Sequence, residues 1–144
     1  METLTFVLRS RDVNTLLSDS CNFQIPFRHY FPENDKMYKL KSTFISEDTS
    51  NVDECALQIS IQGLPLYNRY DTNENTSNRL TLGYANQVLT GNMNYYYYSF
   101  NESIEHKLRA PLNDTIKIQI KDLDTFNLIA FMDEWTLTLQ FEPC

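Results

Sequence analysis

The stretch TIKIQIK, from Thr115 to Lys121, decides the fold class of this 144-residue chain. Its isoleucines, Ile116, Ile118 and Ile120, alternate with polar residues. Successive side chains of a β-strand point to opposite faces of the sheet. The alternation therefore predicts a strand with one face on an apolar core and the other in water.

The same period of two recurs along the chain, whereas helical spacing of apolar residues is nearly absent. The other strand candidates are Leu4–Arg9, Asn22–Ile25, Met37–Ile45, Cys55–Gln62, Leu80–Val88, Tyr95–Phe100, His106–Ala110 and Trp135–Glu142. The segment Thr125–Glu134 has some i, i+3, i+4 spacing, and a helical turn and a packed loop fit it equally well. Many short strands without a βαβ rhythm predict an all-β fold. We expect one domain, residues 1–144, forming an antiparallel β-sandwich of eight or nine strands that resembles a jelly roll.

One face of the strongest strands predicts the core. A register slip of one residue would turn this whole set outward, so we expect all its members to pack together. They are Leu4, Phe6, Leu8, Leu57, Ile59, Ile61, Ile116, Ile118, Ile120, Trp135, Leu137, Leu139 and Phe141.

Composition and charge exclude several classes of protein. The residues are 42% hydrophobic and 13% aromatic, as in globular domains, and the net charge is −7. The sequence has no basic stripe, so it predicts no binding to nucleic acid or to an anionic membrane surface. No apolar stretch approaches the roughly 20 residues of a membrane span. The opening METLTFVLRSRD lacks the pattern of a signal peptide, so synthesis in a reducing cytoplasm is expected.

The three cysteines are Cys21, Cys55 and Cys144. They are odd in number and far apart in the sequence, so they do not predict a disulfide framework. Cys21 and Cys55 fall on apolar faces of predicted strands, where a free cysteine behaves as a small hydrophobic residue.

A run of four tyrosines lies in NMNYYYYSF, from Asn92 to Phe100. In a strand, Tyr95 and Tyr97 face one way, and Tyr96 and Tyr98 face the other. We expect one pair to join the core and the other to contact a neighbouring element or a second subunit. The alternatives are simple strand packing and a stacking site for a sugar or a base. The run supplies the candidate interface residues Tyr95, Tyr96, Tyr97 and Tyr98.

No motif in the sequence predicts a metal site. Residues Asp71 to Asn75 resemble the first half of a calcium loop, but Thr76 and Leu82 stand where the loop needs glycine and glutamate. The histidines, His29 and His106, have no Cys-x-x-Cys or His-Glu-x-x-His motif beside them. The sequence therefore predicts no metal and no cofactor.

The remaining polar groups do not predict an enzyme. Four acids gather near the ends of a predicted hairpin: Asp122, Asp124, Asp133 and Glu134. We interpret them as solvated loop residues, with a glycosidase pair as the alternative. Three Asn-x-Ser/Thr triplets begin at Asn75, Asn101 and Asn113, and without a signal peptide we do not expect them to be glycosylated.

Both ends of the chain resemble small virion proteins of virophages, Polinton-like elements and giant DNA viruses. Near the start, Ser10-Arg11-Asp12 ends a strand, a polar loop follows, and Asn22-Phe23-Gln24-Ile25 begins the next strand. Near the end, Ile116 to Pro143 resembles the last hairpin of these proteins, with Asp133-Glu134-Trp135 opening an alternating strand. The resemblance covers about a third of the chain.

The resemblance implies a non-enzymatic structural protein of a virus particle, a minor capsid or virion-associated component, with no catalytic residue to carry over. It implies localisation in the virion and action through oligomeric contacts, as a homo-oligomer, with a trimer favoured, or with other virion proteins. The alternative is a binding module of lectin or partner-binding type on the same fold. Jelly rolls host both kinds of function, and enzymes too.

Overall fold

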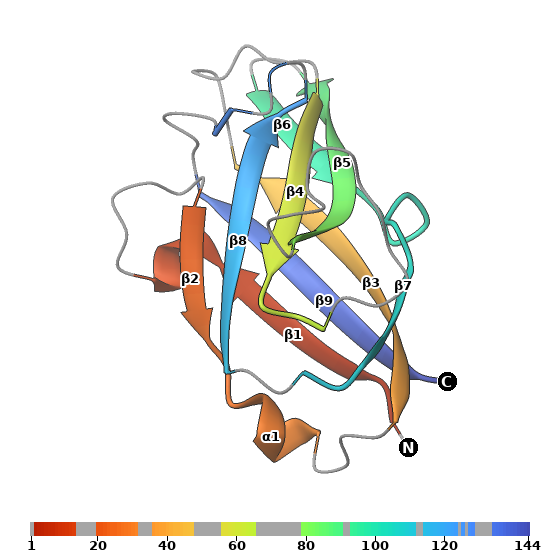
Figure 1. Cartoon of the computed structure of the whole chain (residues 1–144). Helices are drawn as coiled ribbons and strands as arrows, with labels where there is room; N and C mark the ends of the chain where they lie inside the picture. The colour runs from red at the N-terminus through yellow and green to blue at the C-terminus, as the bar shows by residue number, and fades with distance from the viewer. Residues whose placement is uncertain are drawn as a thin grey trace.

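The computed structural model describes residues 2–13, 20–31, 36–47, 56–65, 79–90, 93–111, 114–123, 125, 127–128 and 134–144. Within them the chain forms nine strands and two very short helices (Figure 1). In chain order these are β1 (Leu4–Arg9), the 3-10 helix η1 (Ser10–Asp12), β2 (Ser20–Gln24), the helix α1 (Phe27–Tyr30), β3 (Met37–Ser46), β4 (Ala56–Gln62), β5 (Arg79–Thr90), β6 (Met93–Tyr98), β7 (His106–Arg109), β8 (Thr115–Asp122) and β9 (Trp135–Pro143).

The strands form one antiparallel sheet that folds over into two layers. Hydrogen-bonded neighbours follow the order β1-β9-β3-β6-β5-β4-β8-β2, and β7 also pairs with β3. In Figure 1, β2, β8, β4 and β5 lie side by side in front, and β1, β9 and β3 cross behind them. The prediction of an all-β antiparallel fold is confirmed.

The strand order is that of a jelly roll with one added strand. The rear layer is β1-β9-β3-β7 and the front layer is β2-β8-β4-β5, and the chain passes repeatedly from one to the other. This is the double-layer arrangement of two Greek keys. The added strand is β6, which pairs with β5 on one side and with β3 on the other. It joins the two layers into a nearly closed sheet.

The predicted core is confirmed. Eleven of its thirteen members are buried, and the other two, Leu4 and Phe6, are partly buried and pack against the core. Trp135 is 2% exposed and contacts the ring of Phe23 at 6.1 Å between centroids. The period of two thus identifies the inward face correctly on every strand where it is strong.

A cluster of aromatic rings closes one end of the sandwich. Phe6 lies 5.3 Å from Phe27 and 5.7 Å from Phe141 in edge-to-face contacts, and Phe31 lies 5.1 Å from Phe141. The helix α1 carries Phe27 into this cluster. Figure 1 shows α1 at the lower end of the sandwich. The spacing of apolar residues does not predict α1, because four residues are too few to show a helical period. Pro26 is the N-cap of α1, one position before the first helical residue, where proline is favoured.

The outward face of β4 departs from the prediction. Alternation places Gln58 and Ser60 in water, yet they are 1% and 0% exposed. Each side chain makes one hydrogen bond to a neighbouring strand: Gln58 Nε2 donates to Thr81 Oγ1 at 3.0 Å, and the Ser60 hydroxyl donates to the Gln119 carbonyl at 3.5 Å. The other polar atom of the Gln58 amide, Oε1, is buried and has no hydrogen-bond partner in the described part of the chain. These hydrogen bonds offset part of the cost of burying both faces of β4.

The strand predicted over Tyr95–Phe100 ends earlier than expected, at Tyr98. The Glu102 carboxylate accepts hydrogen bonds from the backbone N–H of Ser99 at 3.1 Å and from its hydroxyl at 3.0 Å. The N–H of Glu102 donates back to the Ser99 carbonyl at 3.1 Å. This reciprocal arrangement turns the chain, so Phe100 lies in the turn rather than in the strand.

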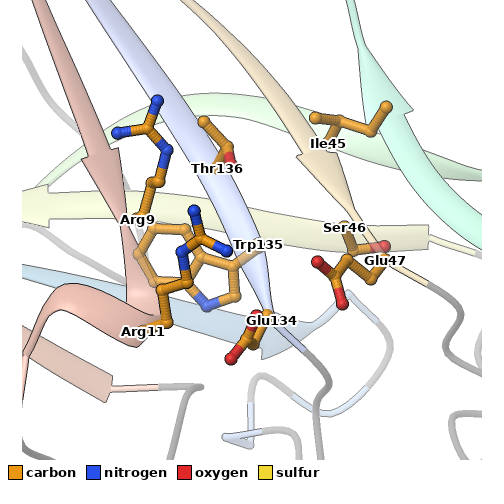
Figure 2. Close-up of a pocket in the computed structure, with 8 residues that line it drawn as sticks. All are labelled: Arg9, Arg11, Ile45, Ser46, Glu47, Glu134, Trp135 and Thr136. Carbon is orange, nitrogen blue, oxygen red and sulfur yellow. The ribbon is translucent and has the colours of Figure 1, made fainter.

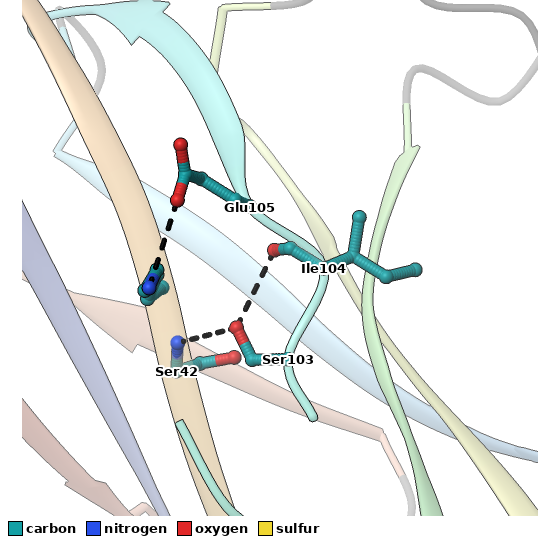
Figure 3. A network of polar contacts seen from close by, with 5 residues as sticks. Ser42, Ser103, Ile104 and Glu105 are labelled. Atoms are coloured by element: carbon teal, nitrogen blue, oxygen red, sulfur yellow. Dashed lines mark hydrogen bonds and ion pairs between the residues drawn. The ribbon is translucent and has the colours of Figure 1, made fainter. Parts of the chain in front are cut away.

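Strand β3 changes partners along one edge. It pairs with β7 from Met37 to Leu40 and with β6 at Phe44 and Ile45. Between these stretches, side chains of the segment before β7 form polar contacts with β3 (Figure 3). The N–H of Ser42 donates to Ser103 Oγ at 3.1 Å, and Lys41 Nζ lies 3.6 Å from Glu105 Oε2.

The segment Thr125–Glu134, predicted as a helical turn or a loop, lies largely outside the described residues. Within the described part, Leu128 forms an antiparallel bridge with Lys121, so the chain is extended at that point.

Candidate interaction surface

The tyrosine run divides between the two faces of β6. Tyr96 and Tyr98 are both 0% exposed, whereas Tyr97 is 40% exposed and Tyr95 is half-buried. The prediction that one pair joins the core is confirmed. Because this chain encloses Tyr96 and Tyr98, they are removed from the candidate interface, which narrows to Tyr95 and Tyr97.

Three contacts fix the ring of Tyr98. It stacks on Phe44 with centroids 6.2 Å apart and planes 11° apart. Its hydroxyl lies 2.6 Å from Ser42 Oγ in a buried hydrogen bond. Its ring covers Gly83, where an added Cβ would lie 2.8 Å from Tyr98 Cζ. Gly83 thus gives the ring room that no other residue type would leave.

Burial raises the pKa of the Tyr98 phenol well above its usual value, and the hydrogen bond to Ser42 acts in the opposite direction and is the smaller effect. Burial acts this way because it penalises the charged phenolate. The hydroxyl of Tyr98 therefore stays protonated while the protein is folded.

This pKa predicts a loss of stability in alkali. A group whose pKa is higher in the folded state stabilises the fold below its unfolded pKa, which is about 10 for tyrosine. Above that pH the unfolded chain loses the proton and the folded chain keeps it. The free energy of unfolding of the wild type should then fall, relative to Tyr98→Phe, by about 1.4 kcal/mol per pH unit. Urea denaturation of both proteins at pH 9, 10 and 11 measures the difference, and parallel curves would contradict it.

The outward tyrosines belong to an apolar patch on the outer face of β3, β5 and β6. The register places Ile45 beside Tyr97 and Val88 beside Tyr95. Ile45 is 46% exposed. Tyr84 is on the same face of β5, two residues from Asn86, which is the β5 partner of Tyr97. We call this patch the tyrosine face, made of Ile45, Tyr84, Val88, Tyr95 and Tyr97.

A second candidate site is a cleft of about 210 Å³ where the ends of β1, β3 and β9 meet (Figure 2). Figure 2 shows its arginines on the β1 side and Glu47 on the β3 side. Two hydrogen bonds hold the walls together: the Trp135 N–H donates to Ser10 Oγ at 3.0 Å, and the Glu47 N–H donates to the Glu134 carbonyl at 2.7 Å. The lining is Arg9, Arg11, Ile45, Ser46, Glu47, Glu134, Trp135 and Thr136.

The cleft is lined by side chains of both charges. The charges of its two arginines and two glutamates sum to zero. Arg9 Nη1 also lies 4.0 Å from Asp12 Oδ2, but both side chains are exposed, so this pair contributes little. The lining hydroxyl of Ser46 accepts a hydrogen bond from the N–H of Tyr96 at 2.8 Å. That hydroxyl therefore supports the backbone of β6 rather than facing a general base.

Of the four predicted acids the structure describes Asp122 and Glu134, which have different surroundings. Asp122 is 8% exposed, so its interpretation as a solvated loop residue is wrong. Its Oδ2 accepts a hydrogen bond from Thr125 Oγ1 at 2.8 Å, and its N–H donates to the Asn127 carbonyl at 2.8 Å. Asp122 therefore anchors the turn after β8. Glu134 is exposed and lines the cleft. Asp124 and Asp133 lie outside the described residues.

The two histidines differ in burial. His29 is exposed at the surface of α1, whereas His106 is buried and its Nε2 donates to the Thr81 carbonyl at 2.6 Å. In the part of the chain that the structure describes, no three His, Cys, Asp or Glu side chains gather in a way that would hold a metal ion. The calcium-like segment Asp71–Asn75 lies outside that part.

The remaining sequence predictions fall on several different environments. Cys21 is buried, as expected, and Cys144 is exposed, whereas Cys55 lies outside the described residues. Asn101 is exposed in the turn after β6, and Asn75 and Asn113 lie outside the described residues. Of the helices that are described, none is long and apolar enough to cross a membrane.

The fold and these surfaces define the class of the protein as an all-β antiparallel domain with jelly-roll strand order. Comparison with protein families and with curated proteins finds no match to this chain.

Proposed function

We propose that this chain is a non-enzymatic structural protein of a virus particle that assembles through its tyrosine face. The observation that carries the proposal is the gathering of Tyr97, Ile45 and Tyr84 on one sheet face, each at least 40% exposed. An exposed patch of large apolar residues commonly marks a protein–protein contact, and tyrosine is enriched in such contacts. The resemblance of both chain ends to small virion proteins supports the same function.

Burial of the tyrosine face would favour association. Covering the exposed part of one such tyrosine contributes about 1–2 kcal/mol at roughly 25 cal/mol per Å². Several copies of the patch, related by closed symmetry, are needed for a stable oligomer. A trimer is the assembly that we favour.

Replacing the outward pair, Tyr95→Ser with Tyr97→Ser, should lower the oligomer mass and leave the melting temperature within a few degrees of the wild type. The reason is that both side chains lie on the outer face and contribute little to the core. Light scattering coupled to size exclusion measures the mass. Leu128→Ser is the matched control, because Leu128 is 42% exposed but lies outside the tyrosine face. A wild type that is monomeric at every concentration would contradict the proposal.

The alternative is a binding module, and the mixed-charge cleft is the observation that favours it. A monomer that binds a small charged ligand, and loses this binding in the variant Arg11→Gln, would support the alternative. Arg28→Gln is a suitable control, because Arg28 is an exposed arginine that does not line the cleft.

A further inference from the structure

Strand β1 has an edge that pairs with no other strand among the described residues. It is the first strand of the sheet order and pairs along its other edge with β9, from Leu4 opposite Phe141 to Arg9 opposite Thr136. Alternate residues of a strand direct their N–H and C=O groups to each edge, so part of the β1 backbone faces outward. Proteins usually protect such an edge with a lysine, a proline or a bulge. The stretch from Thr3 to Leu8 contains no charged residue and no proline.

An apolar groove of about 330 Å³ runs beside this edge. Residues Leu4 to Leu8 form one wall, and Ile25, Pro26 and Tyr30 contribute to the other. Phe6 and Tyr30 meet edge to face with centroids 5.3 Å apart. Val7 is 44% exposed and Tyr30 is 46% exposed. The edge therefore offers backbone hydrogen bonds and apolar contacts at the same place.

We propose that β1 of one copy pairs antiparallel with β1 of a second copy across this edge, forming a two-fold dimer with a continuous sheet. A two-fold axis perpendicular to the sheet places the core-facing side of β1 in one copy on the same side of the joined sheet as that of the other copy. With Phe6 on the axis, Leu4 lies opposite Leu8, and Thr5 lies opposite Val7. Centring the pairing on Thr5 would set Glu2 opposite Leu8, and centring it on Val7 would set Thr5 opposite Arg9. The register centred on Phe6 is therefore the one that pairs Leu4 to Leu8 entirely with one another, and it sets the polar Thr3 opposite Arg9 at each end.

The charges at the ends of the strand fit this pairing. Each chain carries a net charge of −7, so two copies must meet where acids do not oppose acids. Antiparallel pairing brings Glu2 of one copy to the end of the strand where Arg9 and Arg11 of the other copy lie. Asp12 lies at the same end, so Arg9, Arg11 and Asp12 together carry a net charge of +1 there. The same contact occurs twice by symmetry.

This dimer goes beyond the proposed function, because it uses a surface other than the tyrosine face. To distinguish the β1 contact from the tyrosine face, association is measured in the double variant Tyr95→Ser, Tyr97→Ser, in which the tyrosine face is altered. Association that remains in this background is expected to come from β1. Sedimentation velocity of this background variant should show a monomer–dimer equilibrium, whereas a monomer at all concentrations up to about 1 mM, in the millimolar range of weak association, would overturn the inference.

A charge exchange tests the partner and the register. Thr5 and Val7 are exposed, so Thr5→Lys with Val7→Lys, and Thr5→Glu with Val7→Glu, should both fold, which their melting curves check. Each variant alone sets like charges opposite each other and should weaken the dimer about tenfold or more. An equimolar mixture should restore a one-to-one heterodimer. Thr138→Lys is the control, because Thr138 faces the same way on the neighbouring strand and should leave the dimer unchanged. A mixture no tighter than either variant alone would overturn the inference.

Discussion

Tyr98→Ala is expected to lower the free energy of unfolding by about 3–5 kcal/mol. The change leaves a cavity beside Phe44 and removes the buried hydrogen-bond partner of the Ser42 hydroxyl, 2.6 Å away. Domains of this size are stable by only about 5–15 kcal/mol, so the variant should be close to unfolding. Urea denaturation followed by circular dichroism measures the difference.

Tyr97→Ala is the matched control for this substitution. Tyr97 is the preceding residue in the same strand, but it lies on the outer face and is 40% exposed. Its removal should cost less than about 1 kcal/mol, as for most surface changes. Tyr98→Phe separates the hydrogen bond from the ring and should cost about 1–2 kcal/mol. Equal losses for Tyr97→Ala and Tyr98→Ala would show that the strand is not oriented as described.

Gly83→Val is expected to destabilise the protein by about 1–3 kcal/mol through overpacking. A Cβ at this position would lie 2.8, 2.9 and 3.0 Å from three ring atoms of Tyr98. The ring has little room to move, because it stacks on Phe44 and is hydrogen-bonded to Ser42. Thermal unfolding measures the effect.

A double-mutant cycle identifies the cause of this loss. In the Tyr98→Ala background the clash is absent, so Gly83→Val should cost less than it does alone, with a coupling energy of about 1–3 kcal/mol. Asn86→Val serves as the control, because Asn86 is an exposed residue of the same strand and should change stability by less than about 0.5 kcal/mol. Additive effects of the two substitutions would contradict the contact between Gly83 and Tyr98.

The alternation of residues determined the fold class but not every environment. In the tyrosine run it showed that Tyr95 and Tyr97 share one face, and left open which pair is buried. That choice depends on the register with β5, where Tyr96 pairs with Gln87, and on the packing of Tyr98 over Gly83. Neither is visible in a local pattern.

On β4 the same reasoning failed for a related reason. A period of two identifies which residues share a face, but not whether the second face is also covered. Gln58 and Ser60 have the polar character of surface residues, and hydrogen bonds to β5 and β8 offset part of the cost of their burial. The mixed-charge cleft was equally hidden, because more than a hundred residues separate Arg11 from Glu134.

The pairing of β1 with β9 has a consequence for biosynthesis. Leu4 pairs with Phe141, so β1 cannot pair with β9 until almost all of the described sequence has been translated. At about 5–20 residues per second the delay is on the order of ten seconds. Throughout that time both edges of the uncharged stretch from Leu4 to Leu8 are open on the nascent chain. Such a strand is a natural target for chaperones, and assembly of the sandwich should be largely post-translational and slow, as contacts between distant residues generally are.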